Sequence, residues 1–248
     1  MKPSNSHLAN ALRLLDQCTE SELVAVAESL RQRFPELWAR VIGRKAHPLE
    51  VRWGLSAEVI LDAIARSPDL TLRGVRGIIA EAVFEKWVLP HASGWEPIEH
   101  ATAEAFDFLL RQEACPETRA RVQVKLQRLE KQVPKVASAS LRGQLKDPPA
   151  ELFVVEVQKT RTGKARGEDT RPYRFGDFDI LAVNMHPSTQ DWRQFRFTVA
   201  AWLLPRSGNE KLIQIMQPVA AVPDEFWSDS LSTCLAWYRA GLRRRLYQ

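Results

Sequence analysis

Residues 120–127 read ARVQVKLQ, and this stretch decides the fold. Apolar side chains occupy positions 122, 124 and 126, and polar side chains occupy positions 123, 125 and 127. Side chains of a strand point to opposite faces in turn. The period of two therefore predicts a half-buried strand with Gln123 and Lys125 on the same face. Two other interpretations stay open, an ordinary strand with a solvated polar face and a charged helix over residues 117–131.

The apolar pattern to either side predicts helices first and strands later. Helical spacing covers residues 7–42, 56–66 and 73–89, and short apolar runs predict strands over 105–110, 152–158, 178–184, 195–204 and 212–220. We expect a long connection between the strands at 105–110 and 120–127, and a closing helix near 228–245. This order predicts an α/β class, an α+β mixed sheet flanked by helices. It divides into a helical N-terminal region, 1–70, and a mixed-sheet domain with a C-terminal helix, 71–248.

Composition limits the classes of protein to consider. The chain has 248 residues and a formal net charge of +5, which suits a polyanionic partner without requiring one. Its three cysteines, Cys18, Cys115 and Cys234, are too widely spaced for a zinc site or a disulfide framework. No apolar run approaches the ~18 residues of a membrane span, so we expect no membrane partner and a reducing, cytoplasmic location.

The spacing of three polar residues points to a specific chemistry. Asp107 is followed by fifteen residues and then by Gln123-Val-Lys125. If Asp107 lies on a neighbouring strand, its carboxylate and the Gln123 carbonyl offer oxygen ligands to a hard cation such as Mg²⁺. Lys125 can then activate a water or stabilise charge on a phosphate. Together these groups predict metal-assisted attack on a phosphodiester.

Four segments resemble the PD-(D/E)xK nuclease superfamily, the fold of many type II restriction endonucleases. They are FDFLL (106–110), VQVKLQR (122–128), VVEVQKTR (154–161) and TRPYRFGDFDILAV (170–183). The resemblance runs from about Gly74 to Pro218. It departs from the superfamily pattern where Phe106 replaces Pro and Gln123 replaces the usual second acid. It implies a restriction endonuclease-like core, Mg²⁺ as cofactor, double-stranded DNA as substrate and a homodimer.

The resemblance also implies one further carboxylate, because the superfamily often supplies an acid from the helix before the first strand. Glu81 is the candidate here, with Glu85 next, one helical turn further along the same side. The implied site is therefore Asp107, Gln123 and Glu81 as metal ligands, with Lys125 as the catalytic amine.

A second group of residues competes for the metal-site role. Asp147, Glu156, Gln158 and Lys159 also combine acids with an amide and a nearby lysine. Glu156 and Gln158 share a strand face, whereas Lys159 points to the other face. These residues either form the true metal site, support the first one, or make a salt bridge at a sheet edge.

The stretch KTRTGKARGEDTRPYR (159–174) holds six Lys or Arg against two acids. Its glycines and proline predict a loop, which suits contact with a phosphate backbone. The candidate DNA contacts are Arg161, Lys164, Arg166, Arg171 and Arg174. A solvated loop without a partner is the alternative.

These patterns favour a Mg²⁺-dependent endonuclease that cuts double-stranded DNA, of the type II restriction kind. Two alternatives stay open. Gln123 also suits a catalytically inactive nucleic-acid-binding protein on the same fold, and nothing separates a restriction enzyme from a structure-specific repair nuclease. No Gly-rich phosphate loop, GxSxG or HExxH appears, which argues against those enzyme classes.

Overall fold

The computed structural model describes residues 10–11, 13–41, 47–101, 104–159, 164–165, 168–169 and 171–248. The chain divides into two units, Met1–Leu72 and Arg73–Gln248. The first unit is helical, and α6 continues from it into the second. Its helices are α2 (Glu20–Arg33), α3 (Pro35–Val41), α4 (Pro48–Trp53), α5 (Ala57–Ala65) and α6 (Asp69–Val83). No helix among the described residues has both the length and the apolar character needed to cross a membrane.

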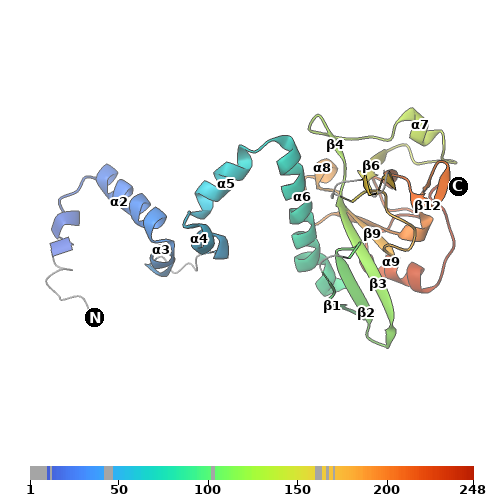
Figure 1. Cartoon of the computed structure of the whole chain (residues 1–248), viewed down its shortest axis with the longest axis horizontal. Coiled ribbons are helices and arrows are strands. Elements are labelled where there is room, and N and C mark those ends of the chain that lie inside the picture. The colour runs from blue at the N-terminus through green and yellow to red at the C-terminus, as the bar shows by residue number, and fades with distance from the viewer. Residues whose placement is uncertain are drawn as a thin grey trace. The chain divides into compact units, whose positions relative to one another are not determined.

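A five-stranded mixed sheet forms the centre of the second unit (Figure 1). Its order is β1-β2-β3-β9-β10, in which β3 and β9 run parallel and every other neighbouring pair runs antiparallel. The strands are β1 (Trp95–Ile98), β2 (Phe108–Gln112), β3 (Cys115–Leu126), β9 (Ile180–Asn184) and β10 (Phe195–Val199). A mixed sheet flanked by helices confirms the predicted α+β class.

Apolar side chains cover both faces of this sheet. On one face Val122 and Val124 pack in a core with α6, the π-helical turn η1 (Phe84–Val88) and α9 (Leu231–Arg239). On the other face Leu181 and Val183 pack against a two-stranded sheet of β6 (Leu152–Glu156) and β13 (Met216–Ala220). The candidate polar residues share this second face, because Gln123 pairs with Leu181 and Lys125 with Val183.

Short elements complete the second unit. They are η2 (Leu89–His91), β4 (Leu129–Glu130), β5 (Val133–Pro134), α7 (Ala139–Arg142), β7 (Lys164–Ala165), β8 (Glu168–Asp169), α8 (His186–Thr189), η3 (Ala200–Trp202), β11 (Pro205–Arg206) and β12 (Asn209–Ile213).

Several predicted boundaries were wrong. The strand expected at 105–110 begins at Phe108, and only Glu113 and Ala114 connect it to β3, where a long connection was expected. The run 195–204 leaves the sheet after Val199, and the run 212–220 divides between β12 and β13. The closing helix spans only Leu231–Arg239. The run 195–204 continued past its strand because residues 202–204 are also buried.

The alternation predicted that the strand at 120–127 is half-buried, and this prediction was wrong. Gln123 is only 2% exposed and Gln127 only 1%, because β6 and β13 cover the polar face as well. A helix over 117–131 is excluded, since Cys115–Leu126 is a strand. A buried amide needs hydrogen-bond partners, so we expect the Gln123 side chain to be hydrogen-bonded within the protein.

Candidate active site

Asp107 lies at the entry to β2, beside the strand that carries Gln123 and Lys125. Its backbone N–H donates to the carbonyl of Val122 at 3.0 Å, which extends the pairing of the two strands. Its Oδ2 accepts a hydrogen bond from the backbone N–H of Val124 at 2.8 Å and another from Nε2 of Gln123. The structure thus brings Asp107 to the QVK segment, as the sequence spacing predicted.

The Gln123 amide is fully engaged between two side chains. Its Nε2 donates to Asp107 and to the Val124 carbonyl, and its Oε1 accepts from the hydroxyl of Tyr173 at 3.0 Å. The nitrogen end therefore faces the carboxylate. A half-turn of the amide about its last torsion is needed before its oxygen can bind a cation beside Asp107.

Lys125 is a nearly buried amine among acids. Burial lowers the pKa of Lys125, and the negative charges of Asp107, Glu81 and Glu156 oppose that shift. Its Nζ lies 5.6 Å from the centre of the Tyr173 ring. It forms no ion pair within the part of the chain that the structure describes, so its charge is compensated only at longer range.

Glu81 and Asp107 form a pair of desolvated carboxyl groups. Burial, followed by the charge of Asp107, raises the pKa of Glu81 on α6. Burial raises the pKa of Asp107 too, against the opposing charge of Lys125 and the hydrogen bonds from Val124 and Gln123. A carboxyl group that is removed from water and feels the charge of a second acid favours its protonated form or a bound cation. We call Glu81, Asp107, Gln123 and Lys125 the Asp107 cluster.

Glu85 does not share this environment. It is exposed and lies in the π-helical turn, whose hydrogen bonds span five residues where an α-helix spans four. The turn breaks the spacing that was expected to place Glu85 and Glu81 on one side of a regular helix. The structure thus favours Glu81 as the assisting acid.

The Asp107 cluster suits a hard divalent cation. Two carboxylates and one carboxamide provide oxygen donors, and burial raises the pKa of both acids in spite of the opposing charge of Lys125. Among the described residues no group of three or more His, Cys, Asp or Glu is arranged to hold a metal. Mg²⁺ needs no such cage, because it commonly binds through one or two carboxylates together with waters and substrate phosphate.

The competing group behaves differently. Glu156 forms an ion pair with Arg128, Nη1 to Oε2 at 2.6 Å, and accepts a hydrogen bond from Gln158. Lys159 pairs with Asp177, Nζ to Oδ2 at 3.0 Å. We call Glu156, Gln158 and Lys159 the Glu156 cluster. It adjoins the first cluster, because the charge of Glu156 acts on Lys125.

Asp147, the remaining member predicted for the second group, lines a separate surface hollow with Lys146, Asp224 and Tyr247. No described contact joins it to Glu156. The second group thus lacks the acid that would have completed a metal site there.

The basic stretch is only partly described. Arg161 and Arg166 lie outside the described residues, and of Lys164 only the backbone, in β7, is described. The stretch is not simply a loop, because β7 and β8 pair antiparallel within it. The Arg171 carbonyl accepts from the Lys159 N–H at 2.8 Å, and Arg174 is exposed.

Two residues of the site were not foreseen from the sequence. Tyr173 reaches Gln123 from fifty residues away, and both Lys125 and Lys159 lie over its ring. The ring of His100 contacts the Asp107 carbonyl through Nε2 at 3.1 Å. Tyr173 lies in the segment 170–183 that carries the resemblance, but neither residue was singled out there as a site residue, and only the folded arrangement shows their contacts.

Comparison with known proteins gives little to add. No protein-family model matches the chain, and no curated protein matches it in sequence. Among solved structures the chain is similar to a bacterial homing endonuclease, I-Ssp6803I, with 19% sequence identity, 67% of this chain and 91% of that chain covered, and a TM-score of 0.33. A likeness at this level assigns neither a fold family nor an activity, so the chemistry must come from the side chains.

Proposed function

We propose that the protein is a Mg²⁺-dependent endonuclease acting on double-stranded DNA, of the type II restriction kind. One observation carries this proposal. The QVK strand holds the Asp107 carboxylate, the charge of Lys125 acts on both Asp107 and Glu81, and the charges of both acids act on Lys125. A desolvated acid pair beside a desolvated amine suits phosphodiester hydrolysis better than it suits a structural salt bridge.

Each side chain has a distinct role in this proposal. Asp107 and Glu81 would hold the cation, and Gln123 would join them after its amide turns. Mg²⁺ held there would polarise the phosphate and lower the pKa of a bound water. Lys125 stabilises the charge that develops on the phosphate, or accepts the proton of the attacking water, which its lowered pKa favours. Tyr173 fixes Gln123 through its hydroxyl.

A basic surface hollow supplies candidate contacts to the phosphate backbone. Its volume is about 470 Å³, and its lining includes Arg174, Lys211 and Arg245 against the single acid Glu210. None of these three cations forms an ion pair with a described residue. The three come from distant parts of the sequence, so the fold has gathered them on one surface. Such a group suits DNA phosphates.

Cleavage of both strands suits a two-fold assembly, and a homodimer forms part of the proposal. A structure-specific repair nuclease would differ from a restriction enzyme in its pattern of cutting. Discrete fragments from plasmid DNA support a sequence-specific enzyme, whereas cutting only at branched or damaged sites supports a repair enzyme.

One observation favours a second function, a catalytically inactive DNA-binding protein. The Nε2 of Gln123 donates to Oδ2 of Asp107, so the amide presents a donor and not an oxygen ligand to that carboxylate. If the amide never turns, Asp107 serves only to hold the strand.

The deciding experiment is incubation of the full chain with plasmid DNA and Mg²⁺, alongside the same chain carrying Asp107→Asn. Mg²⁺-dependent fragments from the wild type alone support the nuclease. DNA binding without cleavage, together with no heat of Mg²⁺ binding in calorimetry, supports the inactive binding protein.

A further inference from the structure

The sheet face that carries the Asp107 cluster continues beyond it along β3. Alternate residues of a strand share a face, so Arg119 and Arg121 follow Lys125 and Gln123 on that face. Exposure changes along this row, because Gln123 is buried, Arg121 is partly exposed and Arg119 is exposed. The candidate site therefore lies where the covered half of the face gives way to an open half.

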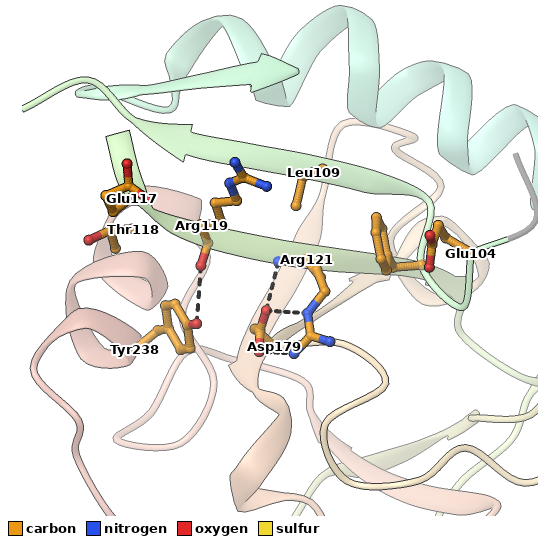
Figure 2. A pocket seen from close by; sticks show the side chains of 9 residues that line it. Glu104, Leu109, Glu117, Thr118, Arg119, Arg121, Asp179 and Tyr238 are labelled. Atoms are coloured by element: carbon orange, nitrogen blue, oxygen red, sulfur yellow. Dashed lines mark hydrogen bonds and ion pairs between the residues drawn. The ribbon is translucent and has the colours of Figure 1, made fainter. Parts of the chain in front are cut away.

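A surface hollow of about 510 Å³ occupies the open half (Figure 2). Its lining combines apolar side chains with hydrogen-bond donors and hydrogen-bond acceptors. They include Phe106, Leu109, Glu104, Glu117, Arg119 and Tyr238. Phe106 directly precedes Asp107, so the hollow begins one residue from the candidate site.

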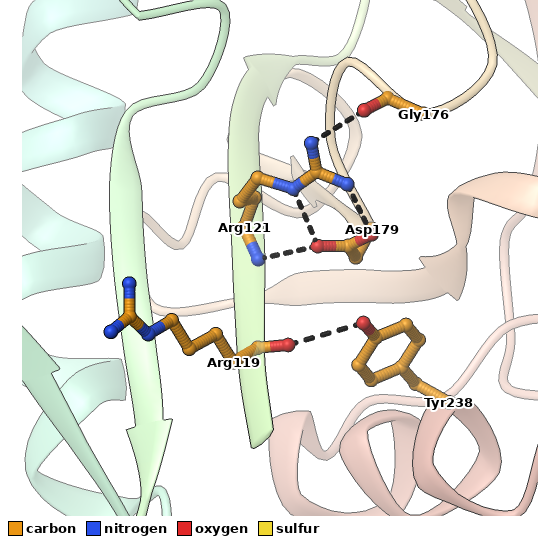
Figure 3. Close-up of polar contacts among 5 residues, drawn as sticks. All are labelled: Arg119, Arg121, Gly176, Asp179 and Tyr238. Carbon is orange, nitrogen blue, oxygen red and sulfur yellow. Dashed lines mark hydrogen bonds and ion pairs between the residues drawn. The ribbon is translucent and has the colours of Figure 1, made fainter. Parts of the chain in front are cut away.

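Arg121 and Asp179 both line this hollow and are hydrogen-bonded to each other (Figure 3). The Arg121 guanidinium donates to both carboxylate oxygens of Asp179, each at 2.8 Å, and to the Gly176 carbonyl at 2.5 Å. The Arg121 backbone N–H also donates to Asp179. These bonds satisfy the Asp179 carboxylate and leave Arg121 committed to the protein.

Arg119 combines a fixed backbone with an uncommitted side chain. Its carbonyl accepts from the Tyr238 hydroxyl at 3.1 Å, and burial raises the pKa of Tyr238, which keeps that hydroxyl protonated. The Arg119 guanidinium has no hydrogen-bond or ion-pair partner among the described residues, and Figure 3 shows it directed away from Tyr238. The strand thus presents a free, bidentate donor at a set position.

We propose that the hollow side of the β2–β3 hairpin enters a DNA groove and that Arg119 reads a base edge there. This inference rests on the proposed function and names its specificity-determining residue. A two-stranded ribbon fits the major groove, where arginine donates bidentately to guanine. Gln123 lies four positions after Arg119, about 13 Å further along the strand. That length corresponds to about four base-pair steps from the scissile phosphate.

The charges of the hollow favour base edges over phosphates. Glu104 and Glu117 line it together with Arg119, and Asp179 is already neutralised by Arg121. These two acids, unpaired within the described part of the chain, repel a phosphate backbone, but carboxylates accept hydrogen bonds from cytosine amino groups. A surface with acceptors and donors side by side suits the neutral, patterned edges of base pairs.

The test is selection from a duplex DNA pool with a randomised segment, in EDTA so that nothing is cut. The full chain is compared with Arg119→Ala, Arg119→Lys, Tyr238→Phe and the control Arg239→Ala. Arg239 is exposed, directly follows Tyr238 and does not line the hollow. Arg239→Ala therefore removes the same positive charge without altering the lining of the hollow. Affinities for the best wild-type duplex and a scrambled duplex are then measured at two salt concentrations.

We expect Arg119→Ala to lose preference at one or two adjacent base pairs and to bind the best duplex about 10-fold to 100-fold more weakly. Binding to the scrambled duplex should change less than about threefold. Arg119→Lys should lose the same preference, because an ammonium cannot replace the fork. Tyr238→Phe, which only loosens the backbone, should blur the preference while the protein stays folded, and Arg239→Ala should retain it.

Equal weakening for both duplexes, with a salt slope smaller by about one, would make Arg119 a phosphate contact and overturn base reading. An unchanged profile, or a wild-type chain that enriches no sequence, overturns it too. Failure of the nuclease proposal is seen separately, by adding Mg²⁺ to the enriched duplex. A chain that enriches a sequence without cutting it keeps this inference and loses the enzyme.

Discussion

The Asp107 cluster and the Glu156 cluster contain similar residues, yet they treat their charges in opposite ways. Glu156 pairs with Arg128 and Lys159 pairs with Asp177, at 2.6 Å and 3.0 Å. Lys125 has no ion pair within the described chain, and burial shifts its pKa and those of Asp107 and Glu81 away from their ordinary values.

The difference indicates that the charges of the Glu156 cluster stabilise the fold, whereas those of the Asp107 cluster suit binding and catalysis. A charge removed from water must be compensated, and direct partners compensate those of the Glu156 cluster. The Asp107 cluster holds two acids and one amine with incomplete compensation, a costly arrangement for a purely structural group. A bound cation and a substrate phosphate would supply the missing compensation, so the arrangement suits a site that binds them.

The largest difference between the clusters should appear when each loses its acid. Asp107→Asn should reduce Mg²⁺-dependent cleavage by about 10³-fold to 10⁴-fold, because a metal ligand is lost. The fold should survive, since the new amide oxygen still accepts from the Val124 N–H. Glu156→Gln is the matched control and should retain cleavage within about tenfold.

The measurement is initial cleavage rate on plasmid DNA, with DNA affinity and melting temperature recorded for each variant. Unchanged affinity with lost cleavage is expected for Asp107→Asn. If Glu156→Gln loses cleavage and Asp107→Asn does not, the roles of the two clusters are reversed.

The two lysines give the next largest contrast. Lys125→Ala should slow cleavage about 10²-fold to 10³-fold with little change in DNA affinity, because an amine near developing charge is lost from a poorly solvated position. Lys125→Arg should not restore the rate, because a planar guanidinium replaces a compact ammonium. Lys159→Ala should stay within about threefold of wild type, although Lys159 lies over the same Tyr173 ring.

Single-turnover rates at saturating Mg²⁺ provide this comparison. Wild-type rates in both Lys125 variants, with the fold intact, would reduce the QVK segment to an ordinary strand.

The sequence foretold the Asp107 cluster because two local rules decide it. Alternation along residues 122–126 places Gln123 and Lys125 on one face, and antiparallel pairing carries the residue before Phe108 to Gln123. Glu81 came instead from the resemblance, which implies an acid on the helix before the first strand. None of these inferences needed contacts from beyond the neighbouring element.

The sequence could not foretell what other elements do to these residues. The burial of Gln123 depends on β6 and β13, and its amide orientation depends on Tyr173, fifty residues away. The π-helical turn that displaces Glu85 leaves no periodic signature in FEKWV (84–88). Equally, nothing local says that Arg128 and Asp177 satisfy the Glu156 cluster, so the two clusters could not be separated from the sequence.

A smaller effect should appear in the pH dependence of Mg²⁺ binding. The pKa values of Glu81 and Asp107 are raised above their ordinary 4.5 and 3.8, so both acids hold protons to a higher pH. Mg²⁺ affinity should fall as pH drops through these raised values, by up to about tenfold per pH unit for each proton displaced. Without the cation, the same shifts make the folded state less stable as pH rises through that window.

Calorimetric titration with Mg²⁺ from about pH 4 to about pH 8, which begins near the ordinary values of the two acids, tests this dependence. Glu81→Gln should move the decline to lower pH, because Asp107 then loses a repelling neighbour. Glu85→Gln, on the exposed π-helical turn, should leave the profile unchanged. An affinity independent of pH over the whole range would show that neither acid binds the cation.

The smallest effect should come from restoring the usual acid at position 123. Gln123→Glu replaces the amino group that donates to Asp107 with a second negative oxygen. The variant should melt at a lower temperature than wild type without Mg²⁺, bind Mg²⁺ about 3-fold to 10-fold more tightly, and regain its stability when the cation is added. Tyr173→Phe provides the companion change, because it frees Oε1 and lets the Gln123 amide turn. If Gln123 is a ligand, Tyr173→Phe should also tighten Mg²⁺ binding, but by less than the negative charge added in Gln123→Glu. Weaker Mg²⁺ binding in Gln123→Glu, together with lost cleavage, would show instead that Gln123 supports Asp107 through its amino group and never binds the cation.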